Sequence, residues 1–111
     1  MRTHKLTIKC KGEQESDSVE ESLEDYFCDF THWYCGLDSA GEDTPIYCLI
    51  YRGIIHPEII TVEFDSERIF GKNSNHEALK MYMDNLVNYG KGRVLSYDIG
   101  PNEYLGFKKW A

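Results

Sequence analysis

The stretch SVEESLEDYFCDFTHWYCGL, residues 18–37, decides the fold because its apolar and acidic residues separate onto two sides of one helix. At about 100° per residue, one broad face collects Val19, Leu23, Tyr26, Phe27, Phe30, Trp33 and Tyr34. The opposite side carries Glu20, Glu21, Glu24, Asp25 and Asp29. Ser18 and Glu21 have capping-box spacing, and Gly36 with Leu37 matches a helix end. We therefore predict one long amphipathic helix over residues 18–37.

A second helix is predicted by the same signals further along the chain. Ser74 and Glu77 form another capping-box pattern, and Gly90 supplies the stop. Between them, residues with helical periodicity share one face: Leu79, Tyr82, Met83, Leu86, Val87 and Tyr89. The preceding segment, residues 66–73, is expected to be a loop, as are the polar residues 12–17.

Four segments show strand patterns around these helices. Residues 3–11 alternate, with His4, Leu6, Ile8 and Cys10 on one side. Residues 46–51 are strongly apolar, and residues 58–65 place Ile60, Val62 and Phe64 inward. Residues 93–100 form the fourth strand, with Leu95, Tyr97 and Ile99 inward. The tail, residues 102–111, is compatible with an added C-terminal strand or with a segment lying across the core.

The element order predicts an α+β protein with a ferredoxin-like βαββαβ sandwich. In this fold two helices pack on one face of a four-stranded antiparallel sheet and leave the other face to solvent. The outward residues of the first and third strands fit a wet face: Lys5, Thr7, Lys9, Thr61, Glu63 and Asp65. We expect a single domain over residues 1–111.

Composition narrows the class of protein. The chain has 111 residues, of which 41% are hydrophobic, which suffices for one core without disulfide staples. No apolar run approaches the length of a membrane span, and the N-terminus lacks the apolar core of a secretion signal. We therefore expect a cytoplasmic protein with reduced thiols, in which Cys10 and Cys48 behave as small buried hydrophobes.

The charge distribution is the most unusual feature of the sequence. The net charge is −7, yet no Lys or Arg occurs between Lys11 and Arg52. That interval holds 11 of the 19 acidic residues, so the rest of the chain has 8 acids against 12 bases. The eleven acids are Glu13, Glu15, Asp17, Glu20, Glu21, Glu24, Asp25, Asp29, Asp38, Glu42 and Asp43.

These acids oppose helix formation rather than assist it. Glu20/Glu24, Glu21/Asp25 and Asp25/Asp29 are like-charge i, i+4 pairs. Each pair should destabilise the helix by about 0.2–0.5 kcal/mol. A charge run of this kind serves either solubility or a surface that meets a basic partner, because complementary fields raise association rates and select partners.

Metal binding is the main alternative for this helix. Cys28, His32 and Cys35 fall at i, i+4 and i+7, and Cys48 offers a fourth ligand, so the ligand types suit zinc. Structural zinc sites, however, usually contain Cys-x-x-Cys pairs, which this sequence lacks. A zinc- or thiol-dependent regulatory protein is thus an alternative, and we predict no metal and no cofactor.

Catalytic signals are weak throughout the sequence. Cys28 and His32 have the spacing of a thiolate–imidazole pair, but the acids around Cys28 should raise its pKa and oppose the thiolate. His4, His56 and His76 are expected to be isolated. The sequence GKGR at 90–93 is a helix stop and turn, not a Gly-rich phosphate loop. We therefore predict that the protein is not an enzyme.

Direct nucleic-acid binding is also disfavoured. Ferredoxin-like sheets bind RNA through aromatic side chains that project from the central strands, and the outward positions predicted here carry none. The negative net charge additionally repels phosphate. A nucleic acid is therefore not the expected partner.

These observations favour a small acidic inhibitor that covers the basic site of a nucleic-acid-acting enzyme. Two classes fit: a toxin immunity protein, and a phage or plasmid anti-defence protein that mimics DNA against a restriction enzyme or CRISPR effector. The eleven acids above, on the helix and on loops 13–17 and 38–43, are the predicted contact residues for a basic protein. A plain interaction or assembly module is the remaining alternative.

Overall fold

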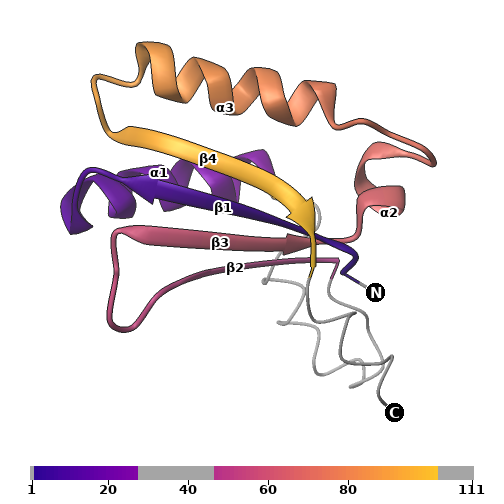
Figure 1. Cartoon of the computed structure of the whole chain (residues 1–111), viewed down its shortest axis with the longest axis horizontal. Coiled ribbons are helices and arrows are strands. Elements are labelled where there is room, and N and C mark those ends of the chain that lie inside the picture. Colours follow the sequence, from indigo (N-terminus) through magenta and orange to yellow (C-terminus); the bar gives the residue numbers. More distant parts are fainter. Residues whose placement is uncertain (1, 28–46, 103–111) are drawn as a thin grey trace.

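The structure, a computed structural model, describes residues 2–27 and 47–102. Its elements in chain order are β1 (His4–Cys10), α1 (Glu13–Tyr26), β2 (Cys48–Arg52), β3 (Ile59–Phe64), α2 (Ser66–Phe70), α3 (Glu77–Tyr89) and β4 (Val94–Pro101) (Figure 1). The short helix α2 is an addition to the βαββαβ order. The predicted α+β, ferredoxin-like fold is therefore confirmed.

The four strands form one antiparallel sheet in the order β2-β3-β1-β4. The first strand thus lies inside the sheet, between β3 and β4. Its residues Leu6 and Ile8 pair with Val62 and Ile60 of β3. Because side chains alternate across a strand, the apolar residues of both strands face the same side, as the alternation predicted.

Both main helices pack on this apolar side of the sheet. Helix α1 and its C-cap contribute Val19, Leu23 and Phe27, which recur every four residues and are fully buried. Helix α3 contributes Leu79 and Met83 to the same core. The strands supply Leu6, Ile8, Cys10, Cys48, Ile60, Val62, Phe64 and Val94. One continuous core therefore holds the two helices and all four strands together.

The two helices also touch each other directly. The rings of Tyr26 in α1 and Tyr82 in α3 are stacked, with centroids 4.2 Å apart. The Tyr82 hydroxyl donates to the carbonyl oxygen of Ser22, at 3.2 Å. This contact fixes the spacing of the helices over the sheet.

Helix α1 begins at Glu13, so the predicted capping box at Ser18 and the loop over residues 12–17 are both wrong. Two interactions explain the earlier start. Glu13 and Glu15 lie in the first turn, where the helix dipole favours acids. The buried Ser16 hydroxyl lies 2.8 Å from the carbonyl oxygens of both Glu13 and Pro57. The second contact comes from a residue far along the chain, which periodicity does not reveal.

Helix α1 ends at Tyr26, with Phe27 as its C-cap. An unbroken helix over residues 18–37 is therefore wrong at this end as well. The Phe27 N–H still donates to the carbonyl of Leu23, at 2.9 Å, and its side chain completes the apolar stripe. The predicted stop at Gly36 and Leu37 lies outside the described residues, as does a C-terminal strand within 103–111.

The region between β3 and α3 contains two further corrections. Residues 66–70, predicted as loop, form α2, because the Asp65 carboxylate accepts the N–H of Arg68, at 3.1 Å. Helix α3 is not capped by Ser74. Its N-cap is His76, which has a left-handed φ of 62°, and the Ser74 hydroxyl accepts the His76 N–H instead.

Two apolar residues that were expected to be inward are exposed. Lys9 pairs with Ser96 while Cys10 pairs with Val94, so Leu95 is the extra residue of a β-bulge and is 53% exposed. Tyr89 is 81% exposed, because it lies about 120° around α3 from the buried Met83 at about 100° per residue. Val94, not Leu95, therefore supplies the inward side chain at the start of β4.

Phe64 provides a direct test of this core. Its ring is fully buried against the rings of Phe27 and Phe70, with centroid distances of 6.3 and 5.6 Å. We expect Phe64→Ala to lower the free energy of unfolding by about 3–5 kcal/mol, measured by urea denaturation. Leu95→Ala, at the exposed bulge, should change it by less than about 0.5 kcal/mol. Equal effects of the two substitutions would contradict the assigned register of β4 and the core.

Candidate functional site

Seven of the eleven predicted contact residues lie on α1 in the described part of the chain. They are Glu13, Glu15, Asp17, Glu20, Glu21, Glu24 and Asp25. The other four, Asp29, Asp38, Glu42 and Asp43, lie outside the described residues. The site is therefore built from the acids of α1 and the residues that contact them.

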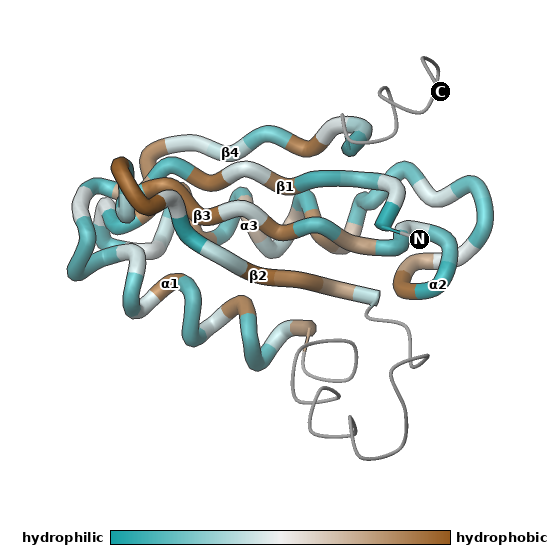
Figure 2. Tube along the Cα trace, turned by 90° about the horizontal axis from the view of Figure 1, so that it is seen from below, coloured by the Kyte–Doolittle hydropathy of each residue, from teal (hydrophilic) through white to brown (hydrophobic). Residues whose placement is uncertain are grey.

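The buried stripe of α1 determines which acids face solvent. Because Val19 and Leu23 point into the core, Glu21, Glu24 and Asp25 are turned outward and are exposed. Figure 2 shows the outer turns of α1 as largely hydrophilic. Within residues 2–27 and 47–102, these three carboxylates take part in no ion pair. We call Glu21, Glu24 and Asp25 the acidic face of α1.

The acids nearer the start of α1 are paired with Arg52. The Arg52 Nη1 atom lies 2.5 Å from Asp17 Oδ1, and its Nε lies 3.1 Å from Glu20 Oε1. Nη1 also donates to the Ser16 hydroxyl, at 2.9 Å. No Lys or Arg is close to Asp17 or Glu20 in the sequence. The fold brings Arg52, the last residue of β2, into contact with both.

The environment of Glu20 shows how crowded these carboxylates are. Burial raises the pKa of Glu20, and the carboxylates of Glu24 and Asp17 act in the same direction. Arg52 opposes them by favouring the ionised form. Arg52 therefore offsets part of the repulsion that the acidic sequence builds into α1.

A second arginine holds the other side of the helix. The Arg93 Nη1 atom donates to the Ser18 hydroxyl, at 2.6 Å, and its Nε donates to the Gly90 carbonyl, at 2.9 Å. Arg52 and Arg93 thus contact α1 from β2 and from the start of β4. Ser18, predicted as a helix cap, instead accepts this hydrogen bond from inside the helix.

The thiols in the described part of the chain are core residues. Burial raises the pKa of Cys48 to about 12 and that of Cys10 to about 11. A thiol held in this way is neither a good nucleophile nor a ready metal ligand. Cys28, His32 and Cys35 lie outside the described residues, and the described His, Cys, Asp and Glu side chains form no cluster of three suited to a metal ion.

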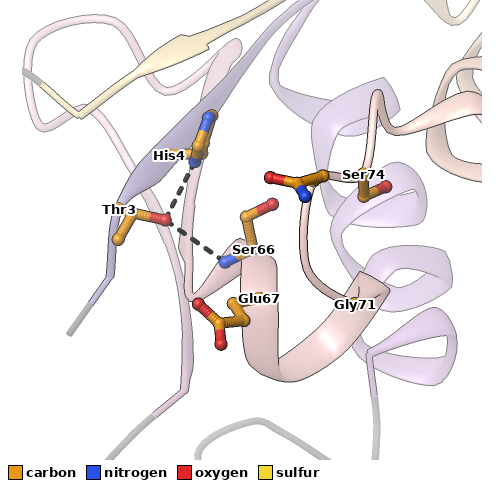
Figure 3. Close-up of a pocket in the computed structure, with 7 residues that line it drawn as sticks. Thr3, His4, Ser66, Glu67, Gly71 and Ser74 are labelled. Carbon is orange, nitrogen blue, oxygen red and sulfur yellow. Dashed lines mark hydrogen bonds between the residues drawn. The ribbon is translucent and has the colours of Figure 1, made fainter.

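A hollow that the sequence did not reveal lies between the start of β1 and the segment from α2 to α3 (Figure 3). It has a volume of about 310 Å³, and its lining residues are Thr3, His4, Ser66, Glu67, Gly71, Asn73 and Ser74. The His4 ring lies beside it, with its centroid 4.8 Å from the ring of His76. The expectation that His4 and His76 are isolated is therefore wrong.

Hydrogen bonds within this hollow join its residues to one another. The Thr3 Oγ1 atom lies 2.9 Å from His4 Nδ1 and accepts the Ser66 N–H, at 3.3 Å (Figure 3). The Ser66 Oγ atom lies 2.6 Å from His76 Nε2, and both side chains are buried. A hydroxyl–imidazole pair is the starting arrangement of nucleophilic catalysis. Here both residues are only 7% exposed, so the pair ties α2 to the start of α3.

The open face of the sheet carries both signs of charge. Glu63 Oε1 lies 3.2 Å from Arg2 Nε, and the Tyr51 hydroxyl donates to Glu63 Oε2, at 2.7 Å. Tyr51 belongs to the edge strand β2, whereas outward positions of β1 carry Lys5 and Lys9. This face therefore differs from the single-signed surface of α1.

Comparisons with protein-family models, with characterised proteins and with solved structures find no match to this chain. Among residues 2–27 and 47–102, no helix combines the length and apolar character needed to cross a membrane.

The histidine pair predicts how stability depends on pH. Burial, the nearby His4 and Lys80 all lower the pKa of His76 below its ordinary value of 6.5. The unfolded chain therefore takes up this proton at a higher pH than the folded chain. The free energy of unfolding should be greatest above about pH 6.5 and fall as the pH drops below it.

His76→Gln should flatten this pH dependence in urea titrations at a series of pH values. His56→Gln is the matched control, because the His56 side chain is 66% exposed, and it should preserve the slope. An unchanged slope in His76→Gln would show that another group carries the dependence.

Proposed function

We propose that this protein is a small, non-enzymatic inhibitor that binds the basic site of a nucleic-acid-acting enzyme through the acidic face of α1. A toxin immunity protein and an anti-defence protein acting on a restriction enzyme or CRISPR effector are the two forms of this function. The observation that carries the proposal is the exposure of Glu21, Glu24 and Asp25 without an ion-pair partner in the described part of the chain.

Energetics support a role for this face beyond the fold. Glu20/Glu24 and Glu21/Asp25 each weaken the helix by about 0.2–0.5 kcal/mol. Arg52 offsets repulsion around Glu20, but the acidic face receives no such compensation from the described ion pairs. A surface kept at this cost suits a partner of opposite charge, because complementary fields accelerate encounter.

The packing of α1 against the rest of the protein also suits a binding surface. Its inner stripe is fully buried, and the helix is contacted by Arg52, at the end of β2, and by Arg93, just before β4. A helix held in this way presents its acids in a fixed arrangement. Little ordering of the backbone is then required on association, which favours affinity.

The chemistry of the described residues favours binding over catalysis. Burial raises the pKa of Cys10 and of Cys48, and the Ser66 and His76 side chains are engaged with each other and only 7% exposed. The acids of α1 are spread over an exposed surface, whereas acid–base catalysis uses carboxylates in an apolar cleft with separated pKa values. These features support a protein that acts by covering another protein.

The test measures DNA cleavage by a panel of purified nucleases: a restriction enzyme, a CRISPR effector and a toxin nuclease. We expect the protein to inhibit a member of this panel. Glu21→Lys/Glu24→Lys/Asp25→Lys should weaken that inhibition by about tenfold or more at low salt, and the difference should shrink near 1 M salt, where charges are screened. Glu20 is left intact because it pairs with Arg52.

The matched control is Glu67→Lys/Glu77→Lys/Asp98→Lys, which changes the net charge equally at exposed acids of α2, α3 and β4. It should inhibit like the unmodified protein. Equal inhibition by the α1 variant, or equal loss in the control, would contradict a specific role for the acidic face.

A further inference from the structure

The loop between β2 and β3 exposes two adjacent isoleucines. Ile54 is 98% exposed and Ile55 is 84% exposed, more than the other large apolar residues in the described part of the chain. Single exposed apolar residues are common on proteins. Two neighbouring β-branched side chains that protrude almost completely from one loop form an apolar point, which we call the isoleucine tip (Ile54 and Ile55).

The backbone beneath the tip is held by hydrogen bonds. The Gly53 N–H donates to the Ile59 carbonyl, at 3.1 Å, and the Ile59 N–H donates to the His56 carbonyl, at 3.0 Å. These bonds close the loop on both sides of the two isoleucines. The tip is therefore presented by a defined turn.

Both stems of the loop are also attached to the first half of α1. Arg52, just before the loop, pairs with Asp17, and the Pro57 carbonyl, just after the tip, lies 2.8 Å from the Ser16 hydroxyl. Figures 1 and 2 place this loop and the start of α1 at the same end of the molecule, with the tip drawn as strongly hydrophobic in Figure 2. The tip and the acids of α1 therefore form one fixed arrangement.

Three acidic residues lie in the segments next to the base of the tip. Glu58 lies three residues after Ile55, and its backbone carbonyl accepts the Cys10 N–H, at 2.9 Å. The charge of Glu15 raises the pKa of that same Cys10 thiol, which places Glu15 in this neighbourhood. Glu13 lies two residues earlier in the same first turn of α1, and Arg52 is already engaged by Asp17. We call Glu13, Glu15 and Glu58 the acidic rim.

We propose that the isoleucine tip is the apolar anchor of the protein's interface and inserts into an apolar pocket bordered by Lys or Arg side chains of a partner protein. This inference rests on the proposed function, since it specifies the surface that the basic partner presents. Apolar anchors that fill a pocket inside a polar rim commonly provide most of the binding energy of an interface. The acidic rim determines the charge that the pocket must carry.

Charge also argues against two other occupants of the tip. A second copy of this chain would bring two acidic rims together on a protein whose net charge is −7. An anionic membrane surface would repel the same rim. A basic protein satisfies both the apolar and the acidic features.

The experiment uses a phage-displayed library of random peptides, selected on the immobilised full-length protein. Enriched peptides should combine apolar residues with Lys or Arg. Their binding should fall about tenfold or more with Ile54→Asp/Ile55→Asp. The control, Met81→Asp/Leu95→Asp, alters two exposed apolar residues elsewhere and should bind like the unmodified protein. Urea denaturation confirms that both variants fold.

The outcomes separate this inference from the proposed function. Basic peptides that bind the Ile54→Asp/Ile55→Asp variant normally and fail to bind Glu21→Lys/Glu24→Lys/Asp25→Lys would overturn the isoleucine tip as the anchor. That result would retain the acidic face as the binding surface. Enrichment of apolar peptides without Lys or Arg would contradict a pocket bordered by basic residues. It would count against both the isoleucine tip proposal and the proposed function. Failure to enrich any peptide would overturn the tip as an anchor.

Two measurements on the protein alone address the other occupants. Sedimentation should show a species whose mass is unchanged by Ile54→Asp/Ile55→Asp, and vesicles of phosphatidylcholine and phosphatidylglycerol should not retain the protein. Self-association or vesicle binding that disappears with the tip substitutions would overturn the proposal in favour of a second copy or a membrane.

Discussion

Burial of one stripe of α1 is the constraint on which the rest of the structure depends. Val19, Leu23 and Phe27 recur at i, i+4 and i+8, so they occupy one side of the helix and pack on the apolar face of the sheet. Once that side is fixed, Glu21 and Glu24 are turned away from the core and are exposed among the residues that the structure describes. The core of the molecule and its acidic surface are thus two consequences of a single helical repeat.

Arg52 links this helix to the remainder of the surface. It sits at the end of β2, contacts Ser16, Asp17 and Glu20, and immediately precedes the loop that carries the isoleucine tip. Its charge reduces repulsion where α1 meets the sheet. The same contact fixes the orientation of the loop relative to α1. The isoleucine tip and the acids of α1 are therefore held in a fixed relative position.

The sequence was most informative where local pattern and burial agree. Alternation in β1 and β3 predicted the inward residues Leu6, Ile8, Val62 and Phe64, and the element order predicted the topology. These features depend on the period of two residues in strands and of about four residues in helices, and both periods can be recognised in the sequence itself.

The remaining features depend on contacts between residues that are distant in sequence. The start of α1 depends on Pro57, the docking of Asp17 depends on Arg52, and the His4–His76 contact joins β1 to the start of α3. The exposure of Leu95 follows from a bulge that only the pairing of β1 with β4 defines. The isoleucine tip appeared in the sequence as a short connection, because apolar residues alone do not show whether anything covers them.

The central claim is that the acidic face of α1 is kept for a partner and not for the fold. The most direct test is the free energy of unfolding of Glu24→Lys/Asp25→Lys at low salt. The substitutions turn two repulsive i, i+4 pairs, with Glu20 and Glu21, into attractive ones. Because each pair loses its repulsion and gains an attraction, the account predicts an increase in stability of about 0.8–2 kcal/mol. A decrease would show that these carboxylates support the fold and would contradict the claim.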